Sequence, residues 1–136
     1  MKSLCRELGS KQGIEIDFTA EDVPRGVRPD VALCLFRIAQ EGLQNLKKHS
    51  GGKKAQLSVR HLGSRLILSL HDEGRGFDAD KLEKPGLGIL SMQGRARVLG
   101  GEFEIHSKPG KGTRIDVWVP LEPAVDQLEV ADRSNV

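Results

Sequence analysis

The sequence contains no tyrosine, and aromatic residues make up only 4% of its 136 residues. Proteins that bind single-stranded nucleic acid usually stack bases on aromatic side chains, and this chain has few of them. It also lacks an excess of one charge, since 21 lysines and arginines stand against 19 aspartates and glutamates. The formal net charge of +2 creates no strong field toward a polyanion. We therefore expect no nucleic-acid partner and no direct membrane contact.

Cysteines and long apolar runs are scarce as well. The two cysteines, Cys5 and Cys34, form no C-x-x-C motif, so the sequence predicts neither a disulfide framework nor a zinc site. No run approaches the roughly 18 apolar residues that cross a bilayer. Residues 1–13 lack the apolar core of a signal peptide. These absences favour a soluble protein in a reduced, intracellular setting.

The spacing of the apolar residues changes along the chain between the period of a strand and that of a helix. Glycine and proline separate the segments, and Gly63 with Ser64 is typical of a tight hairpin turn. The pattern predicts, in order, a strand at 13–20, a helix at 31–49, strands at 55–62 and 65–72, a glycine-rich loop at 73–86, a helix at 87–99, and strands at 102–107 and 114–120. In the first helix, the apolar stripe is Ala32, Leu35, Ala39, Leu43 and Leu46.

This order of elements predicts an α/β fold. Tight hairpins make neighbouring strands antiparallel, while two amphipathic helices must each bury an apolar stripe. The economical solution is a two-layer sandwich, in which a mixed, mostly antiparallel sheet carries both helices on one face. We expect one domain at 13–121, preceded at 1–12 by the end of a helix from another domain and followed at 122–136 by a mobile tail.

Three polar residues of the first helix, Glu41, Asn45 and Lys48, share a stripe about opposite its apolar stripe. A solvated polar face is the simplest interpretation of this spacing. However, an acid, an amide and an ammonium group on successive turns also suit a site for Mg²⁺ and phosphate.

The stretch "DEGRGFD" at 72–78 follows a predicted strand directly. An ionised Asp72 only accepts hydrogen bonds, so it could bind the exocyclic amine of adenine and would reject the oxygen of guanine. Gly74 and Gly76 would let the backbone approach a ring. The alternative is a plain loop with a solvated aspartate.

Two further glycine motifs lie near the starts of later elements. Gly86 and Gly88 lead into the second helix, whose free N–H groups and dipole favour an anion such as a phosphate. Thr113 opens the last strand, where its hydroxyl could reach a base or a water. Each motif alone is also explained as a glycine-rich helix start or as a turn.

The order of these motifs is more specific than any one of them. The chain resembles the ATP-binding catalytic domain of sensor histidine kinases, in the superfamily shared with type II topoisomerase ATPases, the Hsp90 chaperone and MutL. It is most similar to the branch that works with NarL-type response regulators. The resemblance covers about residues 12–121, and its motifs are "FRIAQEGLQNLKKHS", "DEGRGFD", "GLGILSMQGRARVLGG" and "GTRIDVWVP".

The resemblance implies a Bergerat-type fold and a role for each matching position. Asn45 would hold Mg²⁺, Lys48 and His49 would lie near the phosphates, and Glu41 matches the acid that is the general base in the ATPase relatives. In a kinase, Glu41 would position a metal or a water. The catalytic residues would thus be Glu41, Asn45 and Lys48. The implied ATP-binding residues are Asn45, Lys48, His49, Asp72, Gly74, Gly76, Phe77, Gly86, Leu87, Gly88, Ile89 and Thr113, with a lid over ATP at 77–85.

Some positions depart from the pattern of this branch. Glu73 stands where the branch usually has asparagine. Gly42 and Gly94 occupy helix-interior positions where alanine and a charged residue are usual, and each glycine costs roughly 1 kcal/mol relative to alanine. We expect weaker local stability at both glycines.

The chain also lacks a suitable phosphoacceptor. The acceptor of these kinases is a histidine followed by an acidic residue on a helical hairpin. Of the four histidines, only His71 has an acidic neighbour, and it ends a predicted strand beside Asp72. The acceptor is therefore expected on a separate domain.

We thus expect a protein histidine kinase catalytic domain that uses ATP and Mg²⁺ and is inactive alone. Its partners would be a histidine-bearing dimerisation domain of the same protein and a response regulator, in the cytoplasm or in the cytoplasmic part of a membrane-bound sensor. Two alternatives share the fold: a serine kinase that regulates a sigma-factor antagonist, and a non-enzymatic nucleotide-binding interaction module. If the chain were a plain structural domain, the four ordered motifs would have to be coincidences.

Overall fold

The computed structural model describes residues 6, 13, 15–50, 54–74 and 87–122. Its elements in chain order are β1 (Glu15–Glu21), α2 (Pro29–Ser50), β2 (Lys54–Leu62), β3 (Arg65–Asp72), α3 (Leu87–Val98), β4 (Glu102–Ser107) and β5 (Thr113–Pro120). The predicted order of strands and helices is confirmed. The side chains of Lys48 and His49 lie outside the described part of the structure. So do the predictions for nearly all of the helix end at 1–12, for most of the 122–136 tail, for the lid and for residues Gly76, Phe77 and Gly86.

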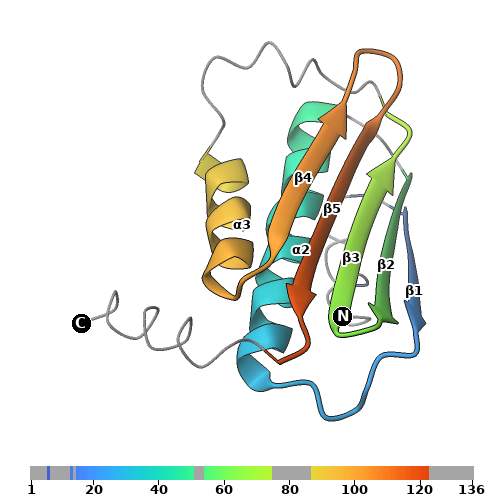
Figure 1. The fold of residues 1–136 in the computed structure, drawn as a ribbon. Coiled ribbons are helices and arrows are strands. Elements are labelled where there is room, and N and C mark those ends of the chain that lie inside the picture. Colours follow the sequence, from blue (N-terminus) through green and yellow to red (C-terminus); the bar gives the residue numbers. More distant parts are fainter. Residues whose placement is uncertain (1–5, 7–12, 14, 51–53, 75–86, 123–136) are drawn as a thin grey trace.

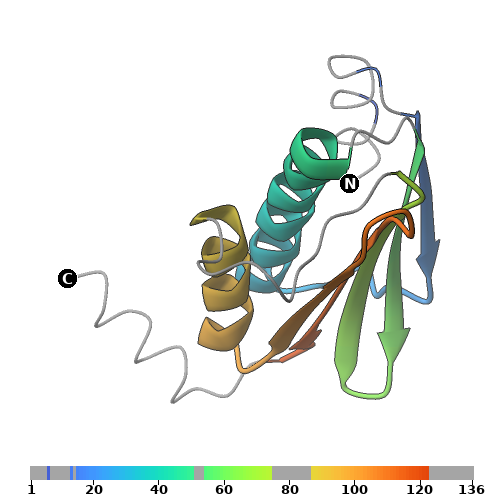
Figure 2. The same ribbon diagram turned by 90° about the horizontal axis from the view of Figure 1, so that it is seen from above.

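The strands form one sheet in the order β1-β2-β3-β5-β4. β1 and β2 are parallel, whereas the other neighbours are antiparallel. Both helices lie on the same face of this sheet (Figures 1 and 2). The predicted two-layer sandwich is therefore confirmed.

The hydrophobic core lies between the sheet and the two helices. Buried residues alternate along β3 and β5, so that one face of each strand points to the helices and the other to solvent. In α2 the buried stripe contains Val31, Leu35, Ala39 and Leu43, but Ala32 is exposed, and its place in the predicted stripe is wrong. Ala32 is exposed because it lines an open apolar hollow with Phe18 and Val27. On its other flank α2 packs against α3.

Candidate functional site

β3 ends in a buried carboxylate. Asp72 is only 3% exposed and belongs to the buried row of β3 that faces the helices. Its Oδ1 accepts a hydrogen bond from the backbone N–H of Gly74 at 2.9 Å, which closes a small turn at the strand end. Burial of a charged group is costly without hydrogen-bond partners. The alternative of a solvated loop aspartate is therefore wrong.

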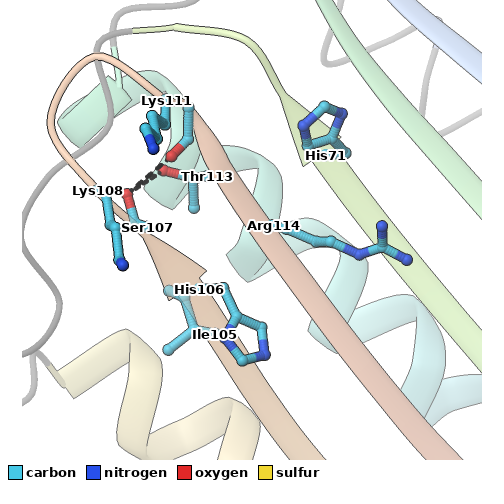
Figure 3. Close-up of a pocket in the computed structure, with 9 residues that line it drawn as sticks. His71, Ile105, His106, Ser107, Lys108, Lys111, Thr113 and Arg114 are labelled. Atoms are coloured by element: carbon cyan, nitrogen blue, oxygen red, sulfur yellow. Dashed lines mark hydrogen bonds between the residues drawn. The ribbon is translucent and has the colours of Figure 1, made fainter.

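Thr113 lies directly opposite Asp72 in the sheet. It is 1% exposed, and its Oγ1 is 2.7 Å from Oγ of Ser107 (Figure 3). The Ser107 hydroxyl also donates to the carbonyl of Gly112 at 3.1 Å, and either hydroxyl can be the donor in the bond between Ser107 and Thr113. A hydroxyl oxygen has two lone pairs that can accept. The Thr113 oxygen therefore keeps acceptor capacity toward a ligand. Ser107 was not predicted, because a serine that ends a strand carries no distinctive signal in the sequence.

Gly112 lets the β4–β5 hairpin approach the end of β3. Its φ is +75°, and a Cβ at this position would lie 2.1 Å from the carbonyl oxygen of Asp72. Any other residue would push the hairpin away from β3. The Gly-Thr pair is thus more than a turn, because it sets the position of Thr113 beside Asp72.

α2 crosses the sheet over this end of β3. A Cβ at Gly42 would lie 2.8 Å from Cδ2 of Leu70 and 3.5 Å from Cδ1 of Ile115. These two are cross-strand partners, and the next buried pair along the strands is Asp72 with Thr113. Because α2 and β3 run in the same direction (Figure 1), the turn of α2 after Gly42 lies at the Asp72 end of the sheet.

That turn carries Asn45, and the turn before it carries Glu41. Nδ2 of Asn45 is buried and has no hydrogen-bond partner among the described residues. Oε2 of Glu41 would lie 3.1 Å from a Cβ at Gly88, so this carboxylate faces the first turn of α3. The predicted position of Glu41 and Asn45 opposite the apolar stripe of α2 is therefore wrong, since α3 covers this flank of the helix. For Glu41 and Asn45, the simple interpretation as a solvated polar face is wrong for the same reason.

The start of α3 has no acidic residue in its first turn, so Glu41 of α2 brings a negative charge close to it. Ile89 is partly buried against the core. Leu87 is the first residue of α3. In the α2 backbone, Lys48 follows Asn45 by about one turn. Two strand ends and two helices thus converge on one region around Asp72.

Comparison with known proteins identifies the family that shares this arrangement. A family model described as histidine kinase-, DNA gyrase B- and HSP90-like ATPase matches residues 30–123. The chain belongs to this ATPase family. The match includes both helices and four of the five strands, so the predicted resemblance is confirmed.

Curated relatives within the ATPase family are sensor proteins. Sensor histidine kinase LiaS of Bacillus subtilis (strain 168) is 37% identical over 125 residues, which are 90% of this chain and 34% of LiaS. Sensor protein VraS of Staphylococcus aureus (strain COL) is 34% identical over 123 residues, 89% of this chain and 34% of VraS. The chain thus spans about a third of the length of these relatives.

Solved structures of histidine kinases have the same fold. The histidine kinase domain of a blue-light activated histidine kinase from Erythrobacter litoralis superposes with a TM-score of 0.70 at 20% identity, covering 88% of this chain and 62% of that one. Full-length ShkA in complex with AMPPNP gives 0.73 at 20% identity, covering 90% and 29%. Within the described residues of this chain, no helix has the length and apolar character to cross a membrane.

Proposed function

We propose that this chain binds Mg-ATP around Asp72 and supplies the γ-phosphoryl group for phosphorylation of a histidine on a separate dimerisation domain, in two-component signal transduction. The observation that carries the proposal is the buried Asp72 carboxylate, held beside the Thr113 hydroxyl at the edge of the core. A buried acceptor pair of this kind suits a ligand that donates hydrogen bonds.

Adenine fits this pair better than guanine. The exocyclic amine of adenine donates, and both the Asp72 carboxylate and the Thr113 oxygen accept. Guanine would place an oxygen against the carboxylate, leaving two acceptors face to face and unsatisfied. Gly74, whose N–H holds Oδ1 of Asp72, keeps the carboxylate oriented toward the base in this proposal.

The polar flank of α2 suits Mg²⁺ and phosphate. The Asn45 amide, whose Nδ2 has no hydrogen-bond partner among the described residues, can turn its oxygen to a cation or its N–H to a phosphate oxygen. Glu41 of α2, whose carboxylate faces the start of α3, would repel a triphosphate unless a cation lay between them. Within the described residues, no group of three or more histidines, cysteines or acids could form a metal cage. Mg²⁺ usually takes one or two protein ligands together with substrate phosphates, so Glu41 and Asn45 would be enough on the protein side.

The chain's own contribution to phosphotransfer is binding and orientation. When bound, Mg²⁺ would supply charge neutralisation at the phosphates. Glu41 and Asn45 would hold the cation, and Lys48 and His49 would lie near the phosphates. Backbone N–H groups at residues 86–89 would bind phosphate oxygens at the helix start. Gly76 and Phe77 would complete the adenine pocket beneath the lid.

The phosphoacceptor belongs elsewhere in this scheme. His71 and His106 alternate with the buried residues of β3 and β4, so both point away from the helix layer. We infer a domain at 13–121 that acts on a dimerisation domain of the same protein and pairs with a NarL-type response regulator. The segments at 1–12 and 122–136 would lie outside this domain. We place it in the cytoplasm, where ATP is available, as part of a sensor like its named relatives.

The test is transfer of phosphate from radiolabelled ATP to the purified histidine-bearing dimerisation domain of the same protein. Asn45→Ala should abolish transfer, because no other described side chain places an amide at this position. Gln44→Ala is the matched control, since Gln44 is exposed on the same turn of α2, and it should transfer normally. Undiminished transfer by Asn45→Ala would contradict the proposal.

A further inference from the structure

A basic hollow of about 270 Å³ lies at the β4–β5 hairpin, and the basic side chains that line it have no role in the proposed ATP site. Its basic lining residues are His71, His106, Lys108, Lys111 and Arg114, which come from three strands and the connecting turn (Figure 3). No carboxylate is among the described residues that line it.

The turn between β4 and β5 brings two of these cations together. The N–H of Lys111 donates to the carbonyl of Lys108 at 3.0 Å, and Gly110 between them has a φ of +77°. Proline at the second position and a left-handed glycine at the third are typical of a type II turn. Lys108 and Lys111 are therefore its first and fourth residues, which lie close together at the end of the hairpin.

The other three basic groups form a row across the sheet. Arg114 of β5 is paired directly with His106 of β4 on one side and with His71 of β3 on the other. Neighbouring strands lie about 4.8 Å apart, so one small ligand can reach more than one of these side chains. Arginine and imidazole N–H groups are hydrogen-bond donors suited to an oxyanion.

Two carboxylates neutralise part of this charge without entering the hollow. Nε of Arg114 donates to Oδ2 of Asp116 at 2.8 Å, and Nε2 of His106 lies 3.3 Å from Oε2 of Glu104. These contacts orient the two basic side chains, and the terminal nitrogens of Arg114 remain for a ligand. Glu104 and Asp116 instead line a separate hollow of about 160 Å³ farther along the same face. The carboxylates of Glu104 and Asp116 thus lie farther along the strands, whereas five basic side chains line the hollow at the hairpin.

The basic side chains that the strands contribute to the hollow lie on the opposite face of the sheet from the proposed ATP site, although Ser107 and Thr113 also line the hollow. Asp72 and Thr113 belong to the buried rows that face the helices, whereas His71 and Arg114 are their sequence neighbours and point to the opposite face. In Figure 3 the helices lie behind the sheet, with the basic side chains in front. A ligand held by His71, His106 and Arg114 would therefore lie on the outer face, across the sheet from the Asp72 carboxylate.

We propose that the basic hollow is a second binding site, on the outer face of the sheet, for a small phosphate-type oxyanion. Lys108, Lys111 and Arg114 supply positive charge, and the two imidazoles add hydrogen-bond donors. The lining favours a compact anion with several oxygens over a neutral or apolar ligand. Free phosphate and a phosphate ester of a small molecule share this chemistry.

The test is an NMR titration of the whole chain with inorganic phosphate, and then with glycerol phosphate, at constant ionic strength. We expect saturable shifts of the amide signals at 106–114 with at least one of the two. Stronger binding of glycerol phosphate would indicate an ester as ligand. Lys108→Gln with Lys111→Gln should weaken this binding at least about tenfold, because two charge-assisted hydrogen bonds are lost.

Two controls separate this site from general charge effects and from the ATP site. Lys54→Gln with Arg60→Gln removes two exposed cations of β2 and should leave phosphate binding unchanged. Asp72→Asn, which alters the proposed ATP site, should also leave it unchanged. Equal shifts with sodium chloride, or full binding by the Lys108 and Lys111 double variant, would mean an adventitious ion only and would overturn the proposal.

Discussion

Replacing Gly112 by alanine tests whether the close approach of the β4–β5 hairpin to β3 builds the site. The left-handed φ of +75° costs alanine about 1–2 kcal/mol. The added Cβ would also lie 2.1 Å from the carbonyl oxygen of Asp72, so one of the two strands must move. Overpacking of this kind costs about 1–3 kcal/mol. We therefore expect Gly112→Ala to lower the free energy of unfolding by roughly 2–5 kcal/mol.

Gly110→Ala is the matched control for this substitution. Its φ of +77° is nearly the same, but nothing lies within 4 Å of a Cβ there. It should cost only the conformational part, about 1–2 kcal/mol, and leave affinity for ATP unchanged. Urea denaturation and calorimetric titration with a non-hydrolysable ATP analogue measure the two effects. Equal losses of stability in both variants, with ATP affinity intact in Gly112→Ala, would refute the reasoning.

Two further predictions concern the helix layer. Gly42→Ala in α2 should be at least about 1 kcal/mol less favourable than Gly94→Ala in α3, because a Cβ at Gly42 would meet Leu70 at 2.8 Å while nothing lies within 4 Å at Gly94. Equal gains in the free energy of unfolding for Gly42→Ala and Gly94→Ala, measured by urea denaturation, would show that Leu70 does not constrain α2. Burial raises the pKa of the Cys34 thiol to about 11, so iodoacetamide at pH 8 should modify Cys34 only after denaturation. Because the unfolded thiol ionises first, the free energy of unfolding should fall between about pH 9 and 11 relative to Cys34→Ala, and a constant difference would contradict this.

Local patterns predicted most of the fold. Strand alternation and helical period arise from the backbone geometry of each element, so the order of elements and the two-layer architecture could be predicted without knowledge of tertiary contacts. The predicted stripe of α2 was wrong at Ala32, because this residue lines an open apolar hollow with Phe18 and Val27. The sequence also did not reveal that Glu41 faces Gly88, because the packing of α3 against α2 is a contact between distant segments.

The candidate site depends on contacts between distant segments. The sequence indicated Asp72 and Thr113 as parts of separate motifs, which could also be explained as a plain loop and a turn. Only the pairing of β3 with β5 shows that they lie opposite one another and are both buried. Ser107, which holds the Thr113 hydroxyl, and the close approach of Gly112 to Asp72 likewise depend on this register. No pattern within either segment specifies it.

The penalty for glycine in helix interiors was predicted equally at two positions, but their surroundings differ. Gly94 is exposed and has open space around it, so the expected loss of helix stability applies there. Gly42 is buried against Leu70, where a larger residue would displace a core side chain. At Gly42, packing opposes the gain in helix stability that alanine would bring.

The most direct test of nucleotide binding is isothermal titration of the chain with a non-hydrolysable ATP analogue and Mg²⁺, beside GTP and the Asp72→Asn variant. The stability of each protein is measured in parallel by urea denaturation. We predict saturable binding that is selective for adenine. In Asp72→Asn, the loss of binding free energy should exceed the loss in the free energy of unfolding. Absence of binding by the folded wild-type chain, or equal binding of GTP and of ATP to both proteins, would contradict the assignment of Asp72 to adenine.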